Sequence, residues 1–175
     1  EAGRAMALWG AVMGLRGALR YFRQGGQGAS GLMGDLMIEL KRAEVDPIAL
    51  RLAADRLPAQ GQLASKLYDL AEIYEQYETR IQGRYMDGED ALRRGAELAG
   101  HCPSLAEQTV FADGFDVLPR TSLRLLAALG AQCRQVYVAF DLCAPDAPDA
   151  ALYEPVRAAH RALKEMCAQS AVPVT

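Results

Sequence analysis

The chain has 175 residues, of which 51% are hydrophobic and 23% are charged, a composition typical of a folded globular protein and not of a disordered one. Its formal net charge of −3 argues against an autonomous DNA-binding module, because such modules carry a basic excess that replaces the counterions on phosphate. The longest apolar stretches are interrupted by arginine or glycine before they reach a membrane-spanning length, so we predict no association with a membrane.

The first predicted element is an amphipathic helix from about residue 5 to residue 24, in which apolar residues recur at three- and four-residue steps. Arg16, Arg20 and Arg23 fall together on another face of this helix. Arginines at this spacing can contact phosphate, although a solvated helix face is the commoner explanation. The apolar residues are Leu8, Val12, Leu15, Leu19 and Phe22.

A glycine-rich stretch at residues 25–34 ends this helix, and residues 26–31 match the GxGxxG dinucleotide fingerprint letter for letter. The fingerprint needs a β-strand before the loop and a helix after it, so that backbone amides can meet a pyrophosphate. A helix precedes the stretch here, so we interpret it as a linker between helices. The chain has no Gly-Lys-Ser or Gly-Lys-Thr, and therefore no Walker A loop.

Four further helices are predicted up to about residue 105. Ser30 is expected to cap the second, and Asp46 the third, with Pro47 at its first position. The longest helix begins at Ser65, and Asp87 caps the one after it. The apolar period of the longest helix, in which we interpret the tyrosines as core, runs through Leu67, Leu70, Ile73, Tyr74, Tyr77 and Ile81.

The pattern changes at about residue 106 to short apolar runs that alternate with helices. This alternation predicts parallel strands joined by right-handed crossovers, and so an α/β part from 106 to 175 after a helical part from 1 to 105. The predicted strands are 109–112, 135–140 and one that starts at Val172, and the predicted helices are 119–131 and 153–169.

Aspartates follow the predicted strands. Asp113 comes directly after the first strand, Asp116 lies three residues farther on, and Asp141 ends the second strand. Ligands bind at the carboxyl ends of parallel strands, so a metal or phosphate site at these residues is one interpretation. Aspartates also terminate strands and cap the helices that follow them, and position alone favours this second interpretation.

The four cysteines are scattered without a Cys-x-x-Cys spacing, and the two histidines lie far apart in the sequence. This pattern is typical of reduced, mostly buried thiols in a cytoplasmic protein, and not of a disulfide framework or a metal site. The cysteines are Cys102, Cys133, Cys143 and Cys167.

Five short motifs occur in a fixed order over most of residues 28–142. They are GLMGDLMIELKR at 31–42, KLYDLAEIYEQY at 66–77, DGEDAL at 87–92, VFADGF at 110–115 and VYVA at 136–139. In this order they resemble the G…L…L…E-x-K-R helix, the KLxDLxxIYxxY and D-x-E-D-x-L segments, and the DGF and V-x-V-A strands of AddB-type (AddB/RexB) subunits of bacterial ATP-dependent helicase–nucleases.

The resemblance implies a region similar to superfamily 1 helicases of the UvrD type, in which a helical subdomain is inserted into a RecA-like α/β domain. Residues 1–105 would be the 1B-like insert, and residues 106–175 an incomplete, P-loop NTPase-like part of the 1A-like domain. In an active helicase the first strand would end in Asp-Glu, where Asp serves the magnesium shell and Glu orients the attacking water. Asp113-Gly114 is a degenerate form of this Walker B position, so we expect no catalytic residue in this chain.

The resemblance also implies a parent protein that acts in double-strand break repair and recombination together with an AddA-type partner, which supplies the ATP-driven motor. The parent's Walker-A-like loop would lie upstream, and its nuclease domain and iron–sulfur cysteines largely downstream. ATP, magnesium and the cluster would thus be cofactors of the parent, with none in this chain. Glu1 at one end and the strand-like 172–174 at the other lead us to expect an excised piece, whose DNA contacts would be Arg16, Arg20 and Arg23.

Two other functions stay open. An active superfamily 1 ATPase fragment would take its catalytic carboxylate from Asp116, although strand-end geometry would aim that side chain elsewhere. A small α/β ligand-binding or regulatory domain would use the strand ends at Asp113 and Asp141. The second alternative predicts a closed, self-sufficient sheet, and a sheet of two or three strands with an uncovered edge would count against it.

Overall fold

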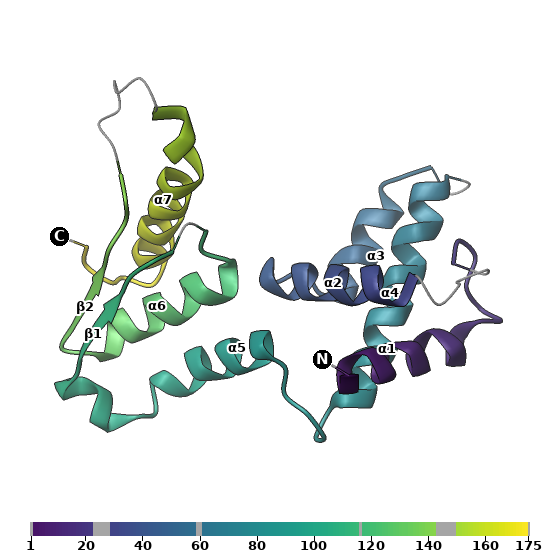
Figure 1. Ribbon diagram of the computed structural model, residues 1–175, viewed down its shortest axis with the longest axis horizontal. Coiled ribbons are helices and arrows are strands. Elements are labelled where there is room, and N and C mark those ends of the chain that lie inside the picture. The colour runs from purple at the N-terminus through teal and green to yellow at the C-terminus, as the bar shows by residue number, and fades with distance from the viewer. Residues whose placement is uncertain (1, 23–28, 59–60, 116, 143–149, 175) are drawn as a thin grey trace. The chain divides into compact units, whose positions relative to one another are not determined.

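The computed structural model describes residues 2–22, 29–58, 61–115, 117–142 and 150–174 (Figure 1). The chain divides into two compact units, residues 1–87 and residues 88–175, which we name the N-terminal unit and the C-terminal unit. Among the described residues, no helix is both long enough and apolar enough to cross a membrane.

The described residues of the N-terminal unit form four helices, as the sequence predicts (Figure 1). The longest, α4, packs against both α1 and α3, and α1 also packs against α2. The four helices are α1 (Ala2–Leu15), α2 (Ala29–Arg42), α3 (Pro47–Asp55) and α4 (Gln62–Ile81).

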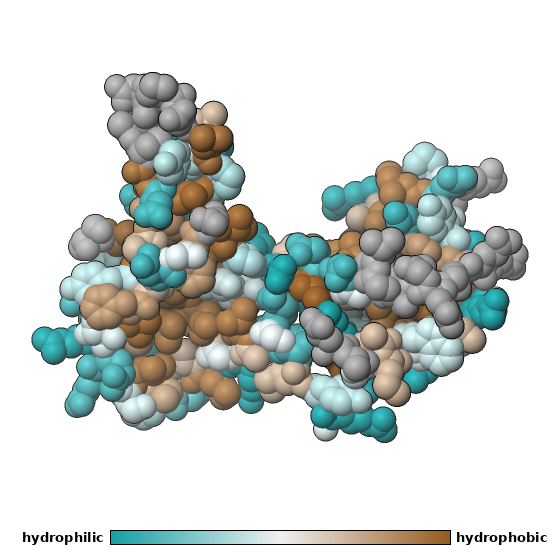
Figure 2. Space-filling view, viewed as in Figure 1, coloured by the Kyte–Doolittle hydropathy of each residue, from teal (hydrophilic) through white to brown (hydrophobic). Residues whose placement is uncertain are grey.

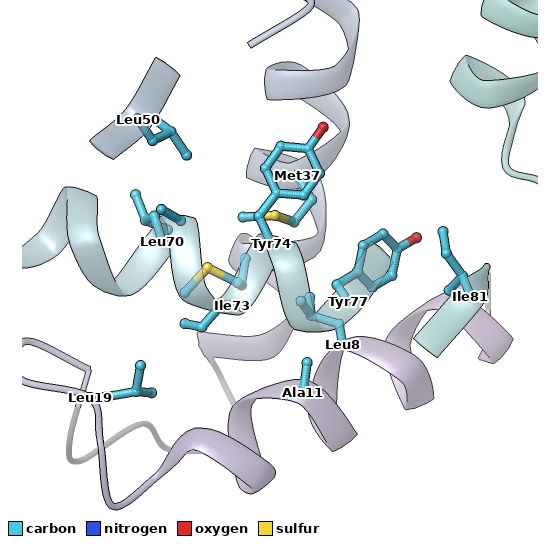
Figure 3. Packing of buried hydrophobic residues seen from close by; sticks show 12 residues of the cluster. Leu8, Ala11, Leu19, Met37, Leu50, Leu70, Ile73, Tyr74, Tyr77 and Ile81 are labelled. Atoms are coloured by element: carbon cyan, nitrogen blue, oxygen red, sulfur yellow. The ribbon is translucent and has the colours of Figure 1, made fainter. Parts of the chain in front are cut away.

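One face of α4 supplies six of the twelve buried residues in the core cluster of this unit (Figure 3). Ile73 and Tyr77 are 0% and 2% exposed and pack in one cluster with Leu8 of α1 and Met37 of α2. Tyr74 is also buried, which confirms that both tyrosines of the KLxDLxxIYxxY segment belong to the core. Burial of a side chain of this size contributes about 1.5–3 kcal/mol relative to exposure, so this cluster dominates the stability of the unit.

Helix starts follow the predicted caps closely, with small shifts. The Asp46 carboxylate accepts the N–H of Ala49 at 2.7 Å, and Pro47 is the first residue of α3, which confirms the predicted cap. α2 starts at Ala29, so Ser30 lies inside its first turn and not before it. α4 starts at Gln62, three residues before Ser65.

The first helix is shorter than the sequence predicts, because α1 ends at Leu15 and not near residue 24. Residues 16–18 form a turn, and the backbone N–H groups of residues 20–22 donate to a carboxylate of α4 and not to helix carbonyls. The prediction that Arg16, Arg20 and Arg23 share one helix face is therefore wrong for the first two, and Arg23 lies outside the described residues. Residues 26–28 of the GxGxxG match also lie outside them.

The C-terminal unit is a β–α–β arrangement with helices added before and after it (Figure 1). Its two strands pair in parallel, as predicted, with Phe111 opposite Tyr137 and Ala112 opposite Val138. Helices α5 and α7 both pack against α6, which connects the strands. The elements are α5 (Gly88–Ala99), the 3-10 helix η1 (Pro103–Glu107), β1 (Thr109–Ala112), α6 (Arg120–Gln132), β2 (Gln135–Val138), the 3-10 helix η2 (Ala150–Tyr153) and α7 (Glu154–Gln169).

The packing of α5 against α6 places residues 88–105 with the C-terminal unit, whereas the sequence pattern groups them with the preceding helices. The helical period of α5 shows that it is a helix but does not show which core it joins. This division describes packing alone, and it does not test the assignment of residues 1–105 to a 1B-like insert and of residues 106–175 to a 1A-like domain.

The sheet has two strands in the described residues. β2 ends at Val138, two residues before the predicted end, and the ladder continues by one hydrogen bond from Ala139 N to Ala112 O. The third strand predicted from Val172 is not formed, because the Val172 N–H donates to the Cys167 carbonyl and its side chain packs on the core of the unit. Hydrophobic side chains are visible on the surface over α5 and α6 (Figure 2).

Helix α7 ends in a Schellman motif that holds a non-glycine residue in the left-handed conformation. Ala171 has φ +55°, and the N–H groups of Ala171 and Val172 donate to the carbonyls of Ala168 and Cys167. Glycine is the residue that usually occupies this position, because an L side chain in this conformation costs about 1–2 kcal/mol.

We predict that Ala171→Gly stabilises the C-terminal unit by about 0.5–1 kcal/mol, since relief of this strain exceeds the added entropy of a glycine in the unfolded chain. Urea unfolding followed by circular dichroism measures the change. Ser170→Gly is the matched control, because Ser170 has φ −94° and gains nothing from glycine. A lower midpoint for Ala171→Gly than for the unmodified chain would contradict the prediction.

Candidate functional site

Asp113 follows β1 directly and ends the strand. Its Oδ1 accepts the N–H of the next residue, Gly114, at 2.8 Å, and Gly114 has φ +78°. Both residues are exposed. The carboxylate is thus used locally to turn the chain, which is the strand-terminating role that position alone favours.

The aspartates predicted at the strand ends do not form a common site in the described part of the chain. Asp141 lies three residues beyond the end of β2 and is exposed, and no hydrogen bond or ion pair of the described residues joins it to Asp113. Asp116 lies outside the described residues. The residues that the structure describes include no group of three or more histidine, cysteine, aspartate or glutamate side chains that could hold a metal ion.

Arg16 and Arg20 lie in the exposed segment that follows α1. In the described part of the chain, neither side chain takes part in a hydrogen bond or an ion pair. The backbone at Arg20 is fixed, because its N–H lies 3.0 Å from both carboxylate oxygens of Asp69. The Arg20 side chain is therefore exposed to solvent on a backbone that Asp69 holds in place.

Asp69 of α4 holds this segment in place. This residue enters the sequence-based predictions only as part of the KLxDLxxIYxxY motif, with no structural role. Its carboxylate accepts the N–H groups of Arg20, Tyr21 and Phe22 at 2.7–3.0 Å, and the residue is 4% exposed. Three successive N–H groups form a cradle that compensates the buried negative charge. Lys66 adds a cation 5.8 Å from the Tyr21 ring centroid.

The KLxDL part of the motif therefore fastens the segment after α1 to α4. The sequence carries a signal of this role, because positions 69, 73 and 77 lie on one stripe of the helix. An acidic residue on an otherwise apolar stripe indicates a buried carboxylate that needs donors from elsewhere in the chain.

A second buried charge joins two other motif segments. Lys41 of α2 is 7% exposed, and its Nζ lies 2.6 Å from Asp87 Oδ2 and 2.8 Å from Glu78 Oε1. The same Nζ lies 5.4 Å from the Tyr77 ring centroid, and the Tyr77 hydroxyl is 3.5 Å from Asp87 Oδ2. One cation thus connects the E-x-K-R helix, α4 and the start of the D-x-E-D-x-L segment.

The Tyr77 hydroxyl makes the stability of the N-terminal unit sensitive to alkaline pH. Burial raises the pKa of Tyr77 from 10.0 to about 12, and the negative charge of Asp87 adds to the shift. The native unit therefore keeps this proton at pH values at which the unfolded chain loses it, so stability falls as pH rises above 10. Between pH 9 and pH 11 the expected loss is about 1.4 kcal/mol.

Urea unfolding followed through Trp9, the single tryptophan of the chain, at pH 9 and pH 11 measures this loss. Tyr77→Phe has no hydroxyl to ionise, so it should lose about 1.4 kcal/mol less than the unmodified chain over the same interval. Equal losses in both proteins would contradict the assignment to Tyr77.

The cysteines differ from one another in exposure. Cys102 is exposed, Cys133 is half-buried and Cys167 is buried, and all three are free thiols. Burial raises the pKa of the Cys167 thiol, which keeps it protonated and unreactive. The prediction of mostly buried thiols is thus right for Cys167 and wrong for Cys102, and Cys143 lies outside the described residues.

The N-terminal family model of AddB matches the chain over residues 1–175. The chain is 26% identical, over 99% of its length, to the B subunit of the ATP-dependent helicase/deoxyribonuclease of Acetivibrio thermocellus. It is 34% identical over 81% of its length to the protein of the same name from Desulforudis audaxviator, and 35% identical over 79% to that from Moorella thermoacetica. The chain spans only 16%, 13% and 12% of these three relatives. The ordered motifs, and the buried contacts that Asp69 and Lys41 make between them, agree with this match, and the chain belongs to the AddB N-terminal family.

Proposed function

We propose that this chain is a non-catalytic, helicase-like segment of the B subunit of an ATP-dependent helicase/deoxyribonuclease that acts in double-strand break repair and recombination in the cytoplasm. It contributes surfaces to the DNA channel and to the contact with an AddA-type partner, which supplies the ATP-driven motor. The relatives' names, which describe each of them as one subunit of a helicase/deoxyribonuclease, support the existence of such a partner. ATP, magnesium and an iron–sulfur cluster are assigned to the parent protein.

The end of β1 carries this proposal. An active motor needs a carboxylate beside the Walker B aspartate to orient the attacking water, and Gly114 stands at that position. Gly114 also has φ +78°, a conformation that costs an L side chain about 1–2 kcal/mol. Both the residue and its backbone conformation therefore support a segment without hydrolytic chemistry.

The sheet supports the idea that the C-terminal unit is part of a larger, RecA-like domain. Parallel sheets are normally covered on both faces, because crossover helices lie on them. Here Phe111 and Tyr137 stack with ring centroids 5.1 Å apart on the uncovered face, 75% and 48% exposed. We propose that residues 106–175 belong to a 1A-like domain completed by other parts of the parent, and residues 1–105 to a 1B-like insert.

The DNA role assigns phosphate contacts to Arg16, Arg20 and Arg23. Fluorescence anisotropy of labelled forked DNA, titrated with the chain at low and moderate salt, tests this assignment. We expect micromolar binding that weakens steeply with salt. The triple substitution to alanine should weaken binding at least 10-fold and reduce the slope of log K against log salt by about 2–3, because each lost phosphate contact removes about one.

Arg93→Ala/Arg94→Ala is the matched control, since both arginines are exposed on α5 but pair with carboxylates of the same helix. Their loss should change binding little. Equal loss of binding in both variants would show that DNA binding depends on overall positive charge and not on these three arginines. No binding at low salt would contradict the proposed DNA role.

The alternatives make different predictions. An active ATPase fragment would hydrolyse ATP in the full-length protein, and Asp116→Asn would abolish that activity. A self-sufficient ligand-binding domain would need a closed sheet, and the two-stranded sheet of the described residues, with both strands at an edge, counts against it.

A further inference from the structure

Helix α1 has a buried face and an apolar exposed face. Leu8 and Ala11 are 0% exposed and pack into the core, whereas Met6, Trp9 and Met13 are 74%, 51% and 42% exposed. We name these last three residues the outer row, because their spacing of three and four places them along one side of the helix. From Met6 to Met13 the helix rises by about 10 Å, which is two turns. A helix that is apolar on both sides normally has a partner on each.

An arginine lies beside the outer row. The Arg80 guanidinium of α4 crosses α1 at Gly10 and Gly14, where Nη1 and Nη2 would lie 3.2 Å and 3.1 Å from a Cβ added at each glycine. Glycine inside a helix costs about 0.5–1 kcal/mol relative to alanine, so two of them here are unfavourable for α1 itself. What they provide is room for a guanidinium on the helix surface.

The stretch of sequence that contains α1 carries only positive charge. Residues 2–34 contain four arginines and no aspartate, glutamate or lysine. Arg16 lies just beyond the end of α1, and, like Arg80, its side chain forms no ion pair with any residue that the structure describes. An incoming surface with carboxylates beside its apolar residues would therefore complement this face.

The composition of this face favours a protein as the occupant. The cores of protein interfaces are enriched in tryptophan, methionine and arginine and depleted in lysine, aspartate and glutamate. A surface for single-stranded DNA would instead offer several aromatic rings in succession. The outer row has one ring between two methionines.

We infer that the outer row of α1 docks an amphipathic helix of the partner subunit. The helix presents apolar residues at positions i, i+3 or i+4, and i+7 to Met6, Trp9 and Met13, and carboxylates on its flank that pair with Arg16 and Arg80. The inference rests on the proposed function to the extent that it takes the partner from there, and it adds the surface and the chemistry that recognises it.

The test measures the affinity of the full-length protein for the purified motor subunit of the same organism by biolayer interferometry. Trp9→Ser/Met13→Ser should weaken binding at least 10-fold. Arg80→Glu should weaken it about 10-fold, with Arg80→Lys close to the unmodified protein. Ile48→Ser/Leu52→Ser is the matched control, because these residues of α3 are 63% and 55% exposed and lie on another helix, and it should leave binding unchanged.

Other outcomes separate this inference from the proposed function. Unchanged affinity of Trp9→Ser/Met13→Ser, with normal binding by the unmodified protein, overturns the inference and leaves the proposed function intact. A loss of forked-DNA binding without a loss of partner binding overturns it in favour of a nucleic-acid surface. If the unmodified protein does not bind the motor subunit, both are overturned.

Discussion

Replacing Asp69 by alanine is expected to destabilise the N-terminal unit by about 3 kcal/mol and to release the segment that follows α1. The carboxylate accepts three successive backbone N–H groups at 2.7–3.0 Å from a position that is 4% exposed. Each buried donor left without an acceptor costs about 1–3 kcal/mol, and entry of water into this partly buried segment moderates the sum. Hydrogen bonds to a charged acceptor are also stronger than those between neutral groups.

Urea unfolding followed through Trp9 measures this effect, and amide hydrogen exchange localises it. Exchange at Arg20, Tyr21 and Phe22 should accelerate under native conditions, before the rest of the unit opens. Glu72→Ala is the matched control on the same helix, because Glu72 is half-exposed and its pair with Arg51 lies at the surface, where such pairs contribute little. A stability loss no larger than that of the control would show that the Asp69 contacts are dispensable.

Much of the fold is predictable from local sequence patterns. The helical period of α4 identifies its buried face, and Asp46-Pro47 identifies the start of α3, since caps and period depend on residues close together in the chain. The parallel pairing of β1 and β2 follows from a helix between two short apolar runs. These elements are formed by interactions that the sequence displays directly.

What the sequence does not display is competition from distant partners. The period of α1 continues past Leu15, but the Asp69 carboxylate, 47–49 residues away, takes the N–H groups of residues 20–22 and directs the chain away from the helix. Val172 has strand propensity, yet its N–H caps α7 and its side chain joins the core. For residues 20–22 the competing contact is a tertiary hydrogen bond, and for Val172 it is the packing of the side chain on the core.

In the candidate site, too, some features are predictable from the local sequence and others depend on distant contacts. Asp113 and Gly114 are identifiable because the position beside a strand end is local, whereas the arrangement of the arginines depends on where α1 ends. Lys41 gives no sign of burial in its own neighbourhood, because Glu78 and Asp87 lie 37 and 46 residues away along the chain. The contact between the E-x-K-R and D-x-E-D-x-L motifs is visible only in the structure, where the Lys41–Asp87 ion pair joins them.

Lys41→Met is expected to destabilise the N-terminal unit by about 2–3 kcal/mol. Removal of one partner of a buried ion pair costs about 3–5 kcal/mol, because the other charge stays uncompensated, and the partial exposure of Glu78 and Asp87, 37% and 17%, reduces this cost. Two side chains just before Asp87 add little burial, since Tyr85 and Met86 are 58% and 62% exposed. Trypsin should therefore cut after Arg84 faster in Lys41→Met than in the unmodified chain.

Two comparisons separate the ion pair from the bulk of the lysine side chain. Arg42→Ala, one position along on the exposed side of α2, should change stability by less than about 0.5 kcal/mol. Lys41→Met/Asp87→Asn removes the charge on Asp87 together with that of Lys41 and leaves only Glu78 without the lysine. It should therefore recover part of the loss, and the double-mutant cycle gives the Lys41–Asp87 coupling. If the loss of stability in the double variant equalled or exceeded the sum of the two single losses, the Lys41–Asp87 contact would not be the interaction that holds residues 82–87 to the N-terminal unit.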